Sequence, residues 1–404
     1  MKIVWICYSA DNELQKLFSK NKIPEQAPWI SSLKKGFLKY KDIELHIISP
    51  NYYLNRNINF RHKGITYHYY KRYIFLPKKV YSFLRMNYIT SFWQYKHYIF
   101  KIINNIKPDI IHLFGTENSE YSIGILPLVS KYHIFVTIQG FRNKIPGNNY
   151  IDKQRKIIEN KIIQNIIYFG IRTNYMKEYI LLFNKKAKFY WHILPFPKPV
   201  SAQFDPELEN TKYDVAFWGR VVLDKGIEDL IYALSLCREK KYNISLLVCG
   251  GVDNNKYLIK LQRIITNLNL TNNIYFTGWI DSREELFKLV SQAKICVLPT
   301  HYDNLPGTVL ESMYIGIPVI VNNVDGMDIL NRERESVVLV DKGNIQMLAD
   351  NIITLLNDNE YRKKLSKNSK ITAMPYFNND NAAIQLINIY NNILNNDSVL
   401  QCLD

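Results

Sequence analysis

Several features are missing from this 404-residue chain. No stretch approaches the ~18 consecutive apolar residues that a membrane-spanning helix needs. The five cysteines are few, odd in number and scattered through apolar segments, which is typical of reduced core residues and not of disulfides or metal ligands. The N-terminus shows no signal-peptide cleavage pattern. The sequence therefore predicts a cytoplasmic protein, and a second hypothesis places it peripherally on the inner face of the plasma membrane.

Signatures of common cofactor sites are also missing. There is no Gly-x4-Gly-Lys-Ser/Thr loop, and no Gly-x-Gly-x-x-Gly follows a strand pattern, which counts against a nicotinamide enzyme. No Asp-x-Asp metal site and no positioned nucleophile are evident. We therefore expect neither a metal ion nor an organic cofactor.

The length and the order of strand and helix patterns predict an α/β protein of two domains. The chain opens with a strand over 2–8, a helix from Trp29 and a strand over 44–49. A cluster of prolines at 195–199 and Pro206 then interrupts the pattern, after which the alternation begins again. We predict an N-terminal domain over 1–200, a second domain over 201–375, and a C-terminal segment over 376–404 that is helical to residue 394.

Residues 299–313 form the most informative stretch. A strand over 295–298 leads into a polar loop, a helix follows from Thr308, and another strand covers 318–321. Ligands of open α/β sheets gather at the carboxyl ends of strands, where a helix N-terminus offers N–H groups to an anion. Asp303 and Glu311 bracket that point and suit hydroxyl groups of a phosphate-bearing ligand. In the competing interpretation, Thr308 and Glu311 form a capping box and Asp303 is a turn residue.

A second loop, residues 219–226, follows the first strand of the second domain. Arg220 offers a bidentate fork and Lys225 a point charge, a pair that suits a diphosphate. If this loop stood alone, Arg220 and Lys225 would be interpreted as two solvated cations on the surface. In the first domain, strand-end loops bring His112, Glu117 and Gln139 to one sheet edge, which makes a substrate pocket plausible, although a single such histidine is more often structural.

Residues 67–101 interleave aromatic residues with Lys and Arg. This pattern fits an anionic membrane surface, single-stranded nucleic acid, or a strand and helix whose aromatic rings are core. The net charge of +16 favours acidic partners in general. Of these we retain the membrane surface and the core interpretation, and we expect no nucleic-acid partner.

Five short motifs, taken together in their order along the chain, resemble those of a known protein family. They are Gly219-Arg220-x4-Lys225-Gly226, Cys249-Gly250-Gly251, Phe276-Thr277-Gly278-Trp279-Ile280, Leu298-Pro299-Thr300 and Asp303-x7-Glu311. Over about residues 210–370 the chain resembles the retaining, nucleotide-sugar-dependent GT-B glycosyltransferases of family 4. Through residues 29–33, 112–117 and 138–140, the first half resembles bacterial members that build cell-surface polysaccharides.

The resemblance implies two Rossmann-like domains facing a central cleft, with the last helix crossing back to the first domain. It implies transfer from a nucleotide-diphosphate sugar, with UDP favoured, to a glycan or polyprenyl-linked acceptor, without a metal. Arg220, Lys225 and Asp303 would be catalytic. The donor site would consist of Gly219, Arg220, Lys225, Gly250, Trp279, Ile280, Asp303, Asn304, Leu305, Gly307, Thr308 and Glu311. The acceptor would meet Trp29, His112, Glu117 and Gln139.

Three positions depart from the family pattern. Asp303 stands where the family usually has Glu, and Gln139 where many members have His. Residues 24–28 replace the usual Gly-Gly. Two other hypotheses therefore stay open, a nucleotide-sugar epimerase of the same fold and a non-catalytic basic protein that binds membranes or nucleic acid.

Overall fold

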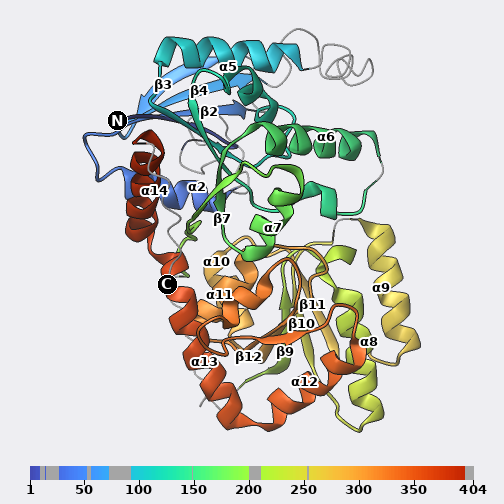
Figure 1. The fold of residues 1–404 in the computed structure, drawn as a ribbon. Helices are drawn as coiled ribbons and strands as arrows, with labels where there is room; N and C mark the ends of the chain where they lie inside the picture. Colours follow the sequence, from blue (N-terminus) through green and yellow to red (C-terminus); the bar gives the residue numbers. More distant parts are fainter. Residues whose placement is uncertain are drawn as a thin grey trace. The chain divides into compact units, whose positions relative to one another are not determined.

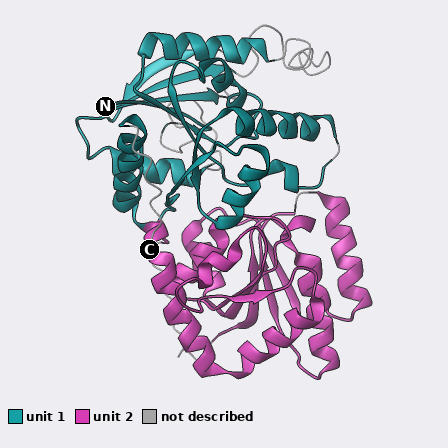
Figure 2. Cartoon of the chain, in the orientation of Figure 1, with its two compact units in different colours: residues 1–197, 378–404 teal, residues 198–377 magenta. Residues whose placement is uncertain are grey.

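The computed structural model describes residues 1–9, 14, 27–51, 56–71, 92–147, 149–199, 211–252 and 254–395. The chain divides into two compact units, coloured separately in Figure 2. Unit 1 comprises residues 1–197 and 378–404, and unit 2 comprises residues 198–377. These bounds lie within a few residues of the predicted ones. Within the described residues, no helix has both the length and the apolar character needed to cross a membrane.

Unit 1 is built on an eight-stranded sheet in the order β3-β4-β2-β1-β5-β6-β7-β8. All neighbouring strands are parallel except β3 and β4, which form a hairpin through Lys63 and Gly64, both with positive φ. The strands are β1 (Lys2–Ile6), β2 (Glu44–Asn51), β3 (Ile58–His62), β4 (Ile65–Lys71), β5 (Ile110–Phe114), β6 (His133–Thr137), β7 (Tyr168–Ile171) and β8 (Lys188–Trp191). The central strands β1 and β5 are almost entirely buried and mostly apolar because helices cover both faces of the sheet.

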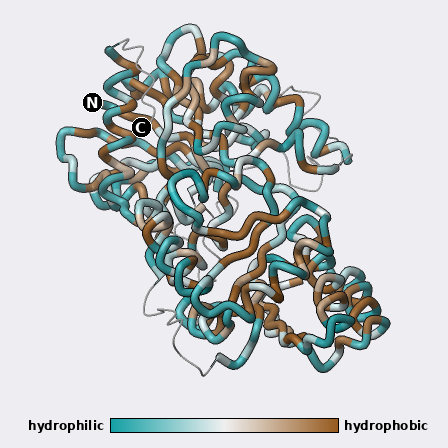
Figure 3. The backbone as a smooth tube through the Cα atoms, turned by 60° about the horizontal axis from the view of Figure 1, so that its bottom comes forward, coloured by the Kyte–Doolittle hydropathy of each residue, from teal (hydrophilic) through white to brown (hydrophobic). Residues whose placement is uncertain are grey.

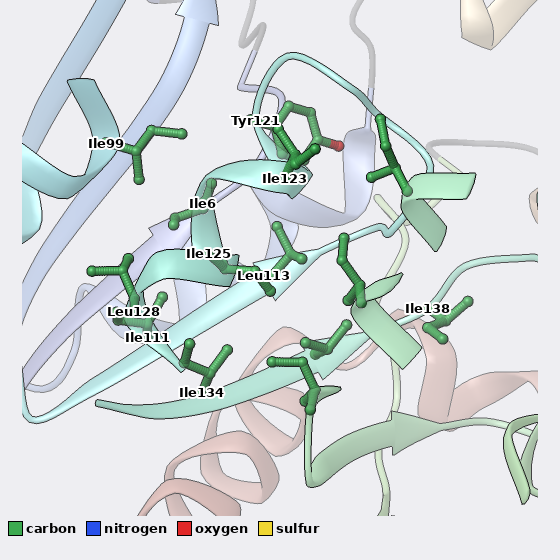
Figure 4. Packing of buried hydrophobic residues seen from close by; sticks show 14 of the residues in the cluster. Ile6, Ile99, Ile111, Leu113, Tyr121, Ile123, Ile125, Leu128, Ile134 and Ile138 are labelled. Carbon is green, nitrogen blue, oxygen red and sulfur yellow. The ribbon is translucent and has the colours of Figure 1, made fainter. Parts of the chain in front are cut away.

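Each face of this sheet has its own core. On one face lie α5 (Trp93–Ile106), η1 (Ser122–Leu128), η2 (Arg142–Lys144), α6 (Tyr150–Asn165) and α7 (Asn174–Phe183). Figure 4 shows how residues such as Ile6, Ile99, Leu113 and Ile125 interlock there. On the other face lie α2 (Pro28–Phe37) and α14 (Asn379–Leu394), which pack against each other. Helix α14 comes from the far end of the chain and is tied to the sheet by a hydrogen bond of 3.0 Å from Trp5 Nε1 to Tyr390 Oη.

Unit 2 is built on a six-stranded parallel sheet in the order β11-β10-β9-β12-β13-β14. The strands are β9 (Tyr213–Trp218), β10 (Leu246–Cys249), β11 (Ile274–Gly278), β12 (Ala293–Leu298), β13 (Val319–Asn322) and β14 (Val338–Val340). The helices are η3 (Leu223–Lys225), α8 (Ile227–Glu239), α9 (Asn255–Asn267), α10 (Arg283–Val290), α11 (Gly307–Ile315), η4 (Met327–Asn331), α12 (Ile345–Asn357), α13 (Asn359–Ala373) and η5 (Met374–Phe377). Figure 1 shows the arrangement of these elements, and Figure 3 shows how hydrophobic and hydrophilic segments alternate along the backbone.

The topology of each sheet selects one point on its carboxyl edge. In unit 2 the chain runs from β9 outward through β10 to β11, then returns to β12 on the other side of β9. The strand order reverses between β9 and β12, and such a switch point is the place where open α/β sheets bind ligands. Both predicted donor loops, residues 219–226 and 299–306, follow these two strands. In unit 1 the corresponding point lies between β1 and β5.

For four aromatic residues of the 67–101 segment, the structure supports the core interpretation. Tyr67, Tyr69 and Tyr70 of β4 and Tyr95 of α5 are at most 2% exposed, so their rings belong to the core. A ring buried in the protein core is not at the surface to enter a bilayer, and the core interpretation holds for these four residues. Residues 72–91, which include several of the predicted cations, lie outside the described residues.

Candidate functional site

The loops after β9 and β12 are packed directly against each other. Gly226 adopts φ 73°, and a Cβ at this position would lie 1.9 Å from the carbonyl oxygen of Pro299. The His301 N–H donates to the carbonyl oxygen of Asp224 at 2.8 Å, which joins the two loops by their backbones. Only glycine permits so close an approach with this φ. The Gly226 of the sequence motif is therefore explained by loop packing.

Gly250 has the same kind of role after β10. With φ 154°, a Cβ there would lie 1.7 Å from the carbonyl oxygen of Gly219. The Gly219 N–H donates to Cys249 O at 2.9 Å, so the loops after β9 and β10 stay in contact beyond the last strand residues. Gly219 and Gly250, both predicted donor-site residues, thus allow two neighbouring loops to approach at the sheet edge.

Helix α11 presents an N-terminus at the switch point. It begins at Gly307 after Pro306, and no side chain among the described residues caps it. The N–H groups of a first helical turn have no carbonyl partner within the helix, so they can bind an anion. Leu305, just before the helix, has φ 51°, a left-handed conformation that costs about 1–2 kcal/mol for a residue with a side chain. The capping-box interpretation of Thr308 and Glu311 is wrong, because Glu311 pairs elsewhere.

The partner of Glu311 is Arg283, the first residue of α10. The Glu311 carboxylate is only 4% exposed and accepts a hydrogen bond from the Arg283 guanidinium, which also lies over the Phe287 ring at 5.1 Å. Burial raises the pKa of the Glu311 carboxyl, and the charge of Arg283 acts in the opposite direction. The carboxylate is thus held in a desolvated place by one half-exposed cation.

The two cationic residues predicted to bind the diphosphate differ in their ion pairing. Lys225 forms an ion pair with Asp303, whose other oxygen accepts the Asn304 N–H at 2.9 Å. Arg220 is exposed and forms no ion pair with any described residue. The structure therefore brings Lys225 and Asp303 together in the absence of a ligand and leaves the guanidinium of Arg220 available to an anion.

The predicted base region lies at the edge strand β11. Trp279 is 61% exposed, and its Nε1 donates to Asp281 at 2.9 Å. A Cβ on Gly251 would lie 3.8 Å from the Trp279 side chain, so this ring stands beside the loop after β10. Ile280 next to it is partly buried.

Three side chains at the site were not predicted from the sequence. Besides Arg283, His301 Nε2 lies 2.7 Å from the Asp229 carboxylate, and Lys342 lies 3.7 Å from the centre of the Tyr302 ring. Each joins the 299–306 loop or α11 to an element distant in sequence. Nothing in the linear pattern marks them, because the pairing depends on which elements meet in space.

In unit 1, the loop after β5 carries a buried carboxyl group at the corresponding switch point. Glu117 Oε2 is buried and has no hydrogen-bond partner among the described residues. Burial raises the pKa of the Glu117 carboxyl, and the charges of Arg155 and Arg142 partly offset this. Nearby Glu159 has a structural role, since it accepts the Arg142 and Asn143 N–H groups at 2.9 and 3.0 Å.

His112 does not reach the sheet edge, contrary to the prediction. It lies in the middle of β5, is 0% exposed, and contacts Tyr390 Oη at 2.6 Å through Nδ1 and Thr137 Oγ1 at 2.8 Å through Nε2. Both ring nitrogens are occupied and the ring is enclosed, so we withdraw His112 from the acceptor site.

The other two predicted acceptor residues remain near the surface. Trp29, at the start of α2, is partly buried, with its ring 6.2 Å from that of Phe196. Gln139 is partly buried, and its backbone carbonyl oxygen accepts a hydrogen bond of 2.7 Å from the Arg172 guanidinium. Within the described residues, no cluster of three or more His, Cys, Asp or Glu residues is arranged to hold a metal ion.

One cavity of about 340 Å³ lies in unit 1, lined by residues 129–134 and 165–168. These segments precede β6 and β7, so the cavity opens at the amino ends of the strands. It is at the opposite edge of the sheet from the loops described above. We therefore do not assign it to the candidate site.

Comparison with known proteins agrees with this arrangement. Residues 201–372 match the family model described as Glycosyl transferases group 1. Residues 201–372 belong to that family. Unit 2 is thus a group 1 glycosyltransferase domain, as the resemblance of residues 210–370 implied.

The relatives and solved structures extend the comparison. The capsular polysaccharide biosynthesis glycosyltransferase CapM of Staphylococcus aureus is 26% identical over 242 residues, which is 58% of this chain and 57% of CapM. The chain spans about half the length of the curated relatives it matches.

Sucrose-phosphate synthase from Thermosynechococcus elongatus has the same fold, with a TM-score of 0.74 at 18% identity over 98% of this chain and 100% of that one. Anabaena HepE in complex with UDP gives 0.68 at 14% identity, over 97% and 100% of the two chains. The predicted GT-B fold is confirmed.

Proposed function

We propose that this protein is a retaining glycosyltransferase that moves a sugar from a nucleotide-diphosphate sugar to a hydroxyl group of a glycan or lipid-linked glycan. The observation that carries the proposal is the anion site of unit 2. The N-terminus of α11, which no described side chain caps, lies after β12. Arg220, which has no ion-pair partner among the described residues, lies after β9, on the other side of the switch point. A diphosphate is the ligand that suits both.

The nucleotide end of the donor would use the buried acid of α11. Glu311 would accept hydrogen bonds from the ribose hydroxyls, and the Trp279-Ile280 segment would line the base. The diphosphate would meet Arg220 and the backbone of residues 305–308. We favour a UDP-sugar, and structures of HepE are known in complex with UDP and with UDP-glucose.

Catalysis would consist mainly of electrostatic stabilisation of the departing diphosphate. Arg220 and the α11 N-terminus would receive the negative charge, and Lys225 would join them by exchanging its Asp303 partner for phosphate oxygens. Asp303, with its carboxylate about one carbon–carbon bond further back than a Glu would place it, would then be free to contact the donor sugar. We propose that the acceptor hydroxyl attacks from the same face, that the leaving diphosphate helps to remove its proton, and that no metal takes part.

The acceptor would be bound by unit 1. Glu117 provides a buried carboxyl at the switch point of that sheet, and its Oε2 has no hydrogen-bond partner among the described residues. Trp29 and Gln139 flank the same edge. The likeness to CapM supports an acceptor from cell-surface polysaccharide assembly.

Saturation-transfer NMR with UDP-, GDP- and ADP-sugars tests the proposal, followed by incubation with a donor that binds and a lipid-linked glycan extract. We expect one class of nucleotide sugar to bind and its sugar to appear in the acceptor with the anomeric configuration of the donor. If none binds, the proposal fails. Epimerisation of a bound donor without transfer would identify an epimerase, and an inverted product would refute the retaining mechanism.

A matched pair of variants locates the site. Arg220→Gln should weaken donor binding at least tenfold, whereas Lys240→Gln, an exposed cation of the same unit, should leave it unchanged. Equal effects of the two variants would show that the binding depends only on net charge.

A further inference from the structure

Two buried polar atoms lie in neighbouring loops at the carboxyl edge of the unit 1 sheet. One is Oε2 of Glu117, in the loop after β5, and the other is Nε of Arg142, the first residue of η2 after β6. Neither atom has a hydrogen-bond partner among the residues that the structure describes. The first is an acceptor and the second is a donor. Because buried polar groups are usually paired, two such atoms at the ligand-binding edge of a sheet indicate a point of ligand contact.

A shared carboxylate holds these two loops together. Glu159 of α6 is fully buried, and its Oε2 accepts hydrogen bonds from Thr116 Oγ1 at 3.3 Å and from the Arg142 N–H at 2.9 Å. The residue next to Glu117 and the backbone of Arg142 therefore contact the same oxygen atom. The charge of Arg142 also acts on the Glu117 carboxyl. The acceptor atom and the donor atom thus belong to one hydrogen-bonded cluster.

Both side chains are held in place by their surroundings. The Glu117 carboxyl lies close to Gly115, which has φ 90° and where an added Cβ would be only 2.9 Å from Oε2. The Arg142 guanidinium pairs through Nη2 with the carboxylate of Asp152, which is 6% exposed, and this pairing does not use Nε. Groups that are already fixed lose little conformational entropy when a ligand binds. The two atoms therefore form a pre-arranged pair of one donor and one acceptor.

A hydroxyl group is the ligand group that matches this pair. It can donate its hydrogen to Glu117 and accept the N–H of Arg142 at the same time. A carboxylate or an ionised phosphate has only acceptor atoms, and an ionised Glu117 would repel it. An ammonium group has only donors, and Arg142 would repel it. The chemistry of the pair therefore favours a neutral sugar over a charged one.

We propose that Glu117 and Arg142 together bind a hydroxyl group of a neutral sugar residue of the acceptor. Glu159 and Asp152 are positioning residues, since they act by holding Arg142 and the two loops. The proposal rests on the proposed function for the role of this sugar as the acceptor. Binding of a sugar to unit 1 can nevertheless be measured without a donor, so the two proposals are tested separately.

Saturation-transfer NMR of the full chain with methyl glycosides tests the proposal. The neutral probes are the methyl glycosides of glucose, galactose and mannose, and the charged probes are methyl glucuronide and methyl glucosaminide. We expect a neutral glycoside to bind more tightly than either charged one. Arg142→Lys keeps the charge but removes the Nε–H, and it should weaken the binding of that neutral glycoside at least roughly tenfold. Glu117→Gln should weaken it severalfold, and it should bind methyl glucuronide more tightly than the original chain does.

Two controls separate this site from general effects of charge and folding. Lys153→Gln removes an exposed cation of α6 and should leave glycoside binding unchanged. Circular dichroism melts show which variants fold, and Glu117→Gln decides the test if Arg142→Lys does not. The affinity for UDP should be the same in both variants as in the original chain, because the proposed donor site lies in unit 2.

The proposal is overturned if no neutral glycoside binds to the original chain, or if folded Arg142→Lys binds one as tightly as the original chain does. Methyl glucuronide binding as tightly as the neutral glycosides would also overturn it. If neutral glycosides bind and the variants weaken them as expected, but no nucleotide sugar binds, the sugar site stands and the proposed glycosyl transfer fails.

Discussion

Replacing Arg283 by Gln should make nucleotide binding depend on pH. Arg283 is the cation that pairs with the carboxylate of Glu311, which is 4% exposed and would hold the ribose. Removing one partner of a fully buried ion pair costs about 3–5 kcal/mol. Because the Arg283 side chain is 50% exposed, water screens the pair, and we expect a smaller loss of about 1–2 kcal/mol. Losing the cation also removes the charge that lowers the pKa of the Glu311 carboxyl.

The pH dependence follows from the sign of this change. Burial already raises the pKa of the Glu311 carboxyl, and the variant would raise it further, so a larger fraction of the carboxyl would be protonated at a given pH than in the original chain. A protonated carboxyl is a poorer acceptor for ribose hydroxyls, so the nucleotide affinity of the variant should be lower than that of the original chain at the acidic end of the pH range and should recover as the pH rises. Because the folded state then binds more protons than the unfolded state, the free energy of unfolding should decrease over the same rise in pH.

Titration calorimetry with UDP between pH 6 and pH 9 measures the affinity, and urea denaturation measures the stability. Lys288→Gln removes another cation of α10, one paired with Glu284, and should change neither curve. Glu311→Gln should bind weakly at every pH. If Arg283→Gln binds UDP with the pH profile of the original chain, Arg283 does not keep Glu311 ionised, and the reasoning is refuted. If the unaltered chain binds no nucleotide, the proposed function itself fails.

Three further predictions concern stability. Gly226→Ala should lower the free energy of unfolding by roughly 2–4 kcal/mol in urea denaturation. The added Cβ would lie 1.9 Å from Pro299 O, and alanine disfavours the positive φ of this position. A loss below about 1 kcal/mol would contradict this packing. Tyr390→Phe should cost about 1–3 kcal/mol, because buried partners in β1 and β5 lose a hydrogen bond. The pKa values of buried His68 and His192 are lowered to about 4 and about 3, so stability should be complete above pH 6.5 and fall below it by roughly 1.4 kcal/mol per pH unit for each histidine; a flat profile between pH 7 and pH 5 would contradict this.

Strand and helix positions were largely predictable because they depend on local patterns. The strand predicted over 295–298 lies within β12, and the helix predicted from Thr308 is α11, which begins one residue earlier. Alternation of strands and helices also predicts parallel sheets, and the ordered motifs of unit 2 indicated its family. The β3–β4 hairpin was not predicted. Its tyrosines lie close in sequence to lysine and arginine residues, and this combination also fits a protein surface.

The burial and the charge pairing of individual side chains depend on the tertiary structure. Nothing local distinguishes His112, which is enclosed by Tyr390 from the far end of the chain, from a histidine at a strand end. In the same way, a capping box and a ribose-binding acid look alike in sequence, and only the approach of α10 gives Glu311 its Arg283 partner. Backbone periodicity is set by neighbours a few residues away, whereas burial and charge pairing are set by segments that meet only after the chain has folded.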